Sequence, residues 1–203
     1  MLRAESHTIA WSGIGLEASA EADTPQDRFM PQMVHQVLAN FPDAGVARAA
    51  AWRPSAILVH LFTNDYCCST AACCGTAKCC GTEANTSSIV STWVDMVLSV
   101  TESEHAATAA PPIFAGCGPM GSTGSFPTDP WGRATFVPCT TLLRGVVALG
   151  ASRGLKVHPI DFSGMYSSDW ENVGGCRHPS AYADLQMATI ARPIVEDVLG
   201  WGA

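Results

Sequence analysis

The amino-acid sequence predicts an α/β fold, a single domain in which helices cover both faces of a parallel sheet. The first observation is an alternation of short apolar runs, typical of strands, with longer segments whose apolar residues recur every three or four positions, typical of helices. The second is the almost continuous apolar run at 56–61, as expected for a strand covered on both faces. The 203 residues suffice for one such domain, predicted to span 1–203.

The predicted elements alternate in order along the chain. Strands are expected at 7–11, 56–61, 112–116 and 155–160, and helices at 30–38, 89–97, 136–149 and 181–199. Glycine and proline punctuate these elements: Gly150 is expected to stop the third helix, and Pro193 to kink the last one. A strand, a helix and a parallel strand form a crossover unit, so the alternation predicts a parallel sheet between two helical layers.

Charge and hydropathy exclude two classes of partner. The net charge is −7 and no cluster of basic residues interleaves with aromatic ones, so no nucleic-acid partner is expected. No window reaches the ~18 continuous apolar residues of a membrane span, so no membrane partner is expected. Nothing after Met1 resembles a signal peptide, and the sequence leaves the cellular compartment open.

The cysteines are unevenly distributed. Of nine, six form the doublets Cys67-Cys68, Cys73-Cys74 and Cys79-Cys80, within a segment at about 67–87 that is predicted to be a loop insertion of low complexity. The doublets could bind a soft metal ion, form disulfides, or be incidental to the insertion. Adjacent doublets differ from the Cys-x2-Cys spacing of zinc sites, so no metal site is expected. Three further cysteines are dispersed: Cys117, Cys139 and Cys176.

The loops after the predicted strands hold the candidate site, because the carboxyl ends of parallel strands share one edge of a sheet and ligands bind there. His178 lies in a glycine-rich loop after the last strand and could act as a general base. Asn64 follows the strand at 56–61, and its amide could donate a hydrogen bond to an oxyanion, as could the N–H of Gly13. These types of residue together indicate acyl transfer.

Each candidate also has a structural alternative. His178 could be an ordinary loop residue, Asn64 could cap a strand, and Gly13 could belong to a plain turn between a strand and a helix. Trp131 and Trp170 fall in loops that are predicted to line the cleft, where they could stack on sugar rings, or they could simply pack in the core or at its rim. The joint convergence of four loops on one edge favours the functional interpretation over the structural one.

The order of short motifs resembles the SGNH, or GDSL-type, hydrolase superfamily, and most closely carbohydrate esterase family 2 with its acetylxylan-esterase-like relatives. The similar blocks are Trp11-Ser12-Gly13-Ile14-Gly15-Leu16, Pro54 to Asp65, Gly118-Pro119-Met120, and Gly175-Cys176-Arg177-His178-Pro179-Ser180. The resemblance implies a flavodoxin-like three-layer α/β/α sandwich and hydrolysis of small acyl esters of carbohydrate, acetyl esters above all, without metal or organic cofactor. It implies that His178 is the base and that Asn64 and Gly13 are the oxyanion donors.

The sequence departs from the family in three places. Gly175 stands three residues before His178, where the family's acid lies when it has one, so a Ser-His dyad would have to suffice. Phe62 stands where the family has glycine, and its bulk is expected beside the oxyanion site. The Gly-Asp-Ser block that carries the nucleophile on the loop after the first strand is missing, so the nucleophile is unknown.

The missing block admits two interpretations of the function. The first is a serine esterase that is truncated at its N-terminus and lacks the first strand of its sheet. The alternative is a catalytically inactive remnant of the same fold that binds carbohydrate or a protein partner.

Overall fold

The computed structural model describes residues 8, 15–16, 30–34, 54–62, 65, 86–105, 110–118, 139–163 and 179–201. Within these residues strands and helices alternate as the sequence predicts, and the α/β class is confirmed. The predicted strand at 7–11 lies outside the described residues except for Thr8. The elements are α1 (Met30–Met33), β1 (Ile57–His60), α4 (Thr86–His105), β2 (Ile113–Cys117), α5 (Cys139–Ser152), β3 (Val157–Asp161) and α6 (Ala181–Leu199).

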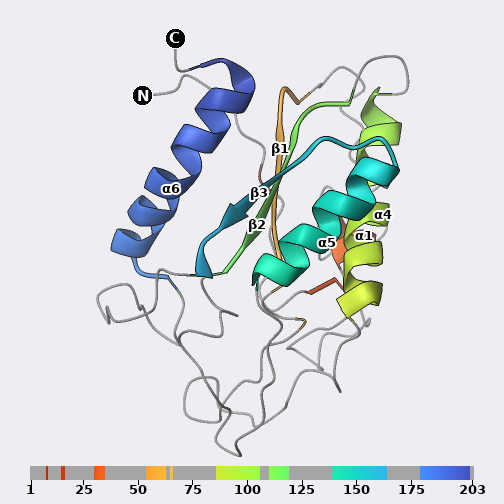
Figure 1. Ribbon diagram of the computed structural model, residues 1–203, viewed down its shortest axis with the longest axis horizontal. Coiled ribbons are helices and arrows are strands. Elements are labelled where there is room, and N and C mark those ends of the chain that lie inside the picture. Colours follow the sequence, from red (N-terminus) through yellow and green to blue (C-terminus); the bar gives the residue numbers. More distant parts are fainter. Residues whose placement is uncertain are drawn as a thin grey trace, which may run out of the picture.

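The three strands form a parallel sheet in the order β1-β2-β3, with Leu58 beside Phe114 and Phe114 beside His158. Because each crossover between neighbouring parallel strands is right-handed and the order advances in one direction, α4 and α5 lie on the same face. Figure 1 shows these two helices on one side of the sheet and α6 on the other. The predicted three-layer arrangement is therefore confirmed.

Alternate residues of the strands supply two separate cores, because successive side chains point to opposite faces. On the face of α4 and α5, Ile113 and Ala115 are fully buried beside Trp93, which is also 0% exposed. On the face of α6, the residues Phe114, Ile160 and Phe162 form one buried cluster with Ala183. The same face of α6 adds the partly buried residues Met187, Ala191, Ile194, Val195 and Val198.

The expectation that the strand at 56–61 is covered on both faces is wrong for β1. Leu58 is 59% exposed and His60 is also exposed, while Ile57 and Val59 on the other face pack against the core under α4 and α5. Among the described strands β1 and β3 are the outer ones, and α6 packs against β3 rather than over β1. The strand buried at every position is β2.

Helix ends differ from the predicted ones where tertiary contacts extend the helix. Helix α4 begins at Thr86, so the last two residues of the predicted insertion at 67–87 belong to it. Helix α5 continues past Gly150, the predicted stop, and the chain reverses instead at Gly154, whose φ is 84°. Pro193 lies inside α6, which runs from Ala181 to Leu199.

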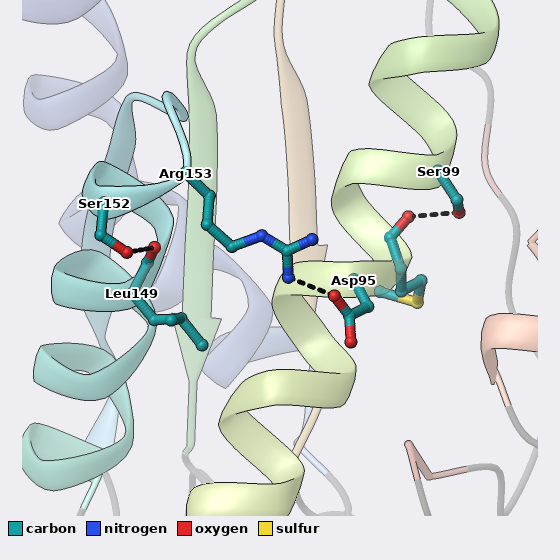
Figure 2. Close-up of polar contacts among 6 residues, drawn as sticks. Asp95, Ser99, Leu149, Ser152 and Arg153 are labelled. Carbon is teal, nitrogen blue, oxygen red and sulfur yellow. Dashed lines mark hydrogen bonds and ion pairs between the residues drawn. The ribbon is translucent and has the colours of Figure 1, made fainter.

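The surface between α4 and α5 carries polar contacts at the amino edge of the sheet, where α5 ends and leads into β3 (Figure 2). Arg153 forms an ion pair with Asp95, and both side chains are largely exposed, at 42% and 56%. Such an exposed pair contributes about 0–1 kcal/mol to stability. Nearby, Ser99 and Ser152 donate hydrogen bonds of 2.7 Å to carbonyl oxygens of their own helices.

No described helix is both long enough and apolar enough to cross a membrane.

Candidate functional site

The carboxyl ends of β1, β2 and β3 lie at one edge of the sheet, and α6 begins at the same edge (Figure 1). This is the edge at which the sequence predicts the site. The five predicted site residues themselves lie outside the described residues, so their roles stay predictions; they are Gly13, Asn64, Trp131, Trp170 and His178. Residues close to three of them are described and show how the segments that carry them are held.

A buried hydrogen bond joins the segment of Gly13 to the segment of Asn64. The backbone N–H of Leu16 donates to Oδ1 of Asp65 over 2.8 Å, across 49 positions of sequence. Leu16 is 1% exposed and Asp65 2%, so water does not compete for this bond. Asp65 follows Asn64 directly in the sequence and Leu16 lies three residues after Gly13, so this bond joins two described residues that are close in sequence to the predicted oxyanion donors.

The helix that follows His178 in the sequence, α6, begins at the same edge of the sheet. Ser180, two residues after His178, is the N-cap: its hydroxyl accepts a hydrogen bond of 3.1 Å from the N–H of Ala183. Ser and Thr are preferred at this position because the side chain satisfies an N–H that has no partner within the helix. Ala183 is fully buried in the same cluster as Phe162, which lies just beyond the end of β3. The cap and this burial anchor the chain two residues from the predicted base.

Phe62 adopts a conformation that favours glycine. Its φ is 86°, where a side chain other than glycine's is strained, and this explains why a glycine is expected at this position. The ring is 2% exposed and stacks on Trp93, with the ring centres 6.5 Å apart and the planes inclined by 20°. Phe62 therefore places its bulk in the core beneath α4, where burial of the ring compensates for the strained backbone.

His60, the last residue of β1, makes a contact at the carboxyl edge of the sheet that the sequence did not reveal. Its Nε2 is hydrogen-bonded to the carbonyl oxygen of Gly118, just beyond the end of β2. Because a carbonyl only accepts, Nε2 carries the proton in this tautomer. The ring lies 5.3 Å from that of Phe162, centre to centre. The sequence concealed this contact because His60 falls within an apolar run. The only sign of it in the sequence is a polar side chain at the carboxyl end of a strand.

The pKa of His60 lies below its ordinary value of 6.5, because burial of the ring disfavours the charged form, and the hydrogen bond to Gly118 opposes this shift. The titratable side chains on β3, the second strand from β1, are His158 and Asp161, and neither contributes to the shift. Part of the His60 residue is nevertheless exposed at the face of the sheet, so the energetic consequence is modest.

Stability should therefore rise with pH through the titration of His60. Around and below the ordinary pKa of 6.5, the unfolded chain binds more protons at this residue than the folded chain. The stabilisation is fully present above the unfolded pKa and is lost as pH falls through the folded pKa. Urea unfolding across this pH range should show a steeper rise for the wild type than for His60→Gln, which keeps an N–H donor but does not titrate. Equal slopes would contradict the assignment.

A disulfide links Cys117, the last residue of β2, to Cys139, the first of α5, with their Cα atoms 5.6 Å apart. Both residues are buried. The sequence showed them only as dispersed cysteines, although their positions at the end of a strand and at the start of the following helix were a usable signal. The N–H of Phe162 donates to the Cys117 carbonyl over 2.8 Å.

In the described part of the chain, no three potential metal ligands come together.

Comparison with solved structures identifies proteins that share this fold. Over 95% of its length the chain superimposes with a TM-score of 0.65 on a carbohydrate esterase family 2 enzyme with a carbohydrate-binding domain from Corynascus thermopiles (Myceliophthora fergusii), at 23% identity. The chain has the fold of carbohydrate esterase family 2. A family two carbohydrate esterase from Clostridium thermocellum, solved in complex with cellohexaose, gives a TM-score of 0.62 at 22% identity, again over 95% of the chain.

A third carbohydrate esterase, whose active site is described as having divergent catalytic and non-catalytic binding functions, gives a TM-score of 0.58 at 21% identity over 92% of the chain. The chain covers 52%, 50% and 48% of these three structures, about half the length of the carbohydrate esterases it matches. No protein-family model and no curated protein matches the sequence. The SGNH-type similarity indicated by the short motifs is confirmed at the level of the fold.

Proposed function

We propose that this chain carries the general base and the oxyanion donors of a carbohydrate esterase site, and that its substrates are small acyl esters of carbohydrate, acetyl esters above all. The observation that carries the proposal is the buried hydrogen bond between Leu16 and Asp65, which ties together the two segments that hold Gly13 and Asn64. The fold shared with carbohydrate esterases supports the same class of substrate.

In this mechanism His178 takes a proton from the hydroxyl of a nucleophilic serine, which attacks the ester carbonyl. The amide of Asn64 and the N–H of Gly13 donate hydrogen bonds to the oxyanion that develops on the carbonyl oxygen. His178 then gives its proton to the departing sugar oxygen, which leaves as a hydroxyl, and water releases the acyl group in a second round of the same chemistry. Trp131 and Trp170 would stack on sugar rings beside the reacting ester.

One observation favours binding without turnover. No Gly-Asp-Ser motif occurs in the sequence, so the nucleophile of the mechanism has no identified counterpart. We therefore expect little hydrolysis of p-nitrophenyl acetate by this chain, because a base and oxyanion donors alone retain only residual catalysis. A fluorophosphonate probe separates the two functions: covalent labelling of a serine indicates a usable nucleophile, and absence of labelling favours a carbohydrate-binding protein.

Calorimetric titration with an acetylated xylo-oligosaccharide tests the site itself, whether or not a nucleophile is present. We expect the wild type to bind, and His178→Ala and Asn64→Ala to weaken binding about fivefold each, the size of one net hydrogen bond. Arg153→Ala is the matched control, because this exposed residue lies at the opposite edge of the sheet and should leave binding unchanged. Binding that is insensitive to both site variants would refute the proposed location.

A further inference from the structure

The exit of β2, residues 116–118, is held from three sides by contacts with other elements. From β1, Nε2 of His60 donates to the carbonyl oxygen of Gly118. From the segment after β3, the N–H of Phe162 donates to the carbonyl oxygen of Cys117 over 2.8 Å. From α5, Cys139 forms the disulfide with Cys117. The last backbone groups of β2 are thus fixed by links that come from three different parts of the chain.

Two glycines allow other elements to lie close to the backbone at the exit of β2. A Cβ atom at Gly116 would lie 3.2 Å from both Cδ2 of His60 and Cε2 of Phe162, closer than packed side chains usually come. Gly118 has a φ of 88°, and a Cβ there would lie 2.9 Å from the backbone nitrogen of Ser163. Glycine at both positions lets the imidazole and the segment after β3 lie directly against the backbone of β2.

The contact of His60 differs from the other two links in its place and chemistry. The disulfide leaves β2 on the face of α4 and α5, because Cys117 belongs to the core on that side. His60 lies on the α6 face together with Phe162, and its contact is made to the carbonyl of the final described residue before Pro119. Its hydrogen bond therefore orients the carbonyl group of Gly118 at the exit of β2, at the carboxyl edge of the sheet.

We propose that His60 is a positioning residue of the esterase site: by donating from Nε2 to the Gly118 carbonyl, it fixes the exit of β2 at the carboxyl edge of the sheet, where the proposed function places the carbohydrate ester. The inference rests on the proposed function for the identity of the ligand. A backbone that is held in place before the ligand arrives loses less conformational entropy on binding, so binding is tighter.

Two variants separate the hydrogen bond from mere packing. His60→Phe keeps an aromatic ring against Phe162 and removes the donor, whereas His60→Gln keeps an N–H donor of similar reach. We expect His60→Phe to weaken binding of an acetylated xylo-oligosaccharide about fivefold, and His60→Gln to retain most of the wild-type affinity. The ¹³C chemical shift of the Gly118 carbonyl should move in His60→Phe and return toward the wild-type value in His60→Gln. Leu58→Ala, an exposed change on the same face of β1, is the control and should leave binding unchanged.

The outcomes are distinguishable. Weaker binding by His60→Phe with rescue by His60→Gln supports the positioning role. Wild-type affinity in both variants overturns it while the proposed function stands. A change in the Gly118 signal without a change in affinity also overturns it, because His60 would then be only structural. A wild type that does not bind the oligosaccharide refutes the proposed function, and the positioning role falls with it.

Discussion

Replacing Phe62 by alanine should destabilise the protein by about 3–5 kcal/mol, the usual cost of deleting a buried aromatic ring. Phe62 is 2% exposed and stacks on Trp93 in the core beneath α4. Phe62→Gly creates the same cavity but relieves the backbone at a φ of 86°, where a non-glycine residue costs roughly 1–2 kcal/mol. We therefore expect the glycine variant to be more stable than the alanine variant.

This order reverses the ordinary one, since glycine is about 1 kcal/mol less stable than alanine within a helix. Ala148→Gly, at an exposed position of α5, provides the matched control for that ordinary order. Free energies of unfolding from urea titrations of all three variants and the wild type give the comparison. If Phe62→Gly proves less stable than Phe62→Ala, the strained conformation assigned to Phe62 is wrong.

Removal of the Cys117–Cys139 disulfide should cost about 3 kcal/mol, the value for a closed loop of this length. The two cysteines are separated by 22 positions, so the bond restricts the unfolded chain substantially. The double variant Cys117→Ala/Cys139→Ala should lower the free energy of unfolding in denaturant titrations. Alanine is preferred to serine, because a serine hydroxyl at either buried position would add a polar group that needs a hydrogen-bond partner.

A reducing agent provides the control for the disulfide. Reduction should bring the wild type close to the double variant and leave the double variant itself unaffected. If the double variant and the oxidised wild type unfold at the same denaturant concentration, the disulfide does not form in solution. A stabilising disulfide further predicts that the protein matures in an oxidising compartment, because such bonds rarely persist where thiols are kept reduced.

The alternation of strands and helices could be predicted because both signals are local periodicities of apolar residues. Boundaries were less accurate, as at Gly150, where packing of α5 against β3 carries the helix past a residue that favours stopping. Exposure of Leu58 was not predictable from its own strand, because it depends on where α6 lies. The periodicity of apolar residues in a segment predicts whether it is a helix or a strand, but not which other elements pack against it.

The same limit applies to the site. Short motifs indicated the loops at the carboxyl edge, and the bond between Leu16 and Asp65 now links two of those segments. The partnership of His60 with Gly118 was invisible, because it joins residues 58 positions apart through a register that no local pattern encodes. The pairing of Cys117 with Cys139 was hidden among nine cysteines for a similar reason.

The most direct measurement is a crystal structure of the chain with a bound acetylated xylo-oligosaccharide. The proposed function predicts that the sugar lies at the carboxyl edge of the sheet, between the exit of β2 and the start of α6. The side chains of Asn64 and His178 and the N–H of Gly13 should all face its ester group. A sugar bound at the amino edge beside Arg153, or Asn64 and His178 on opposite edges of the sheet, would contradict the esterase site.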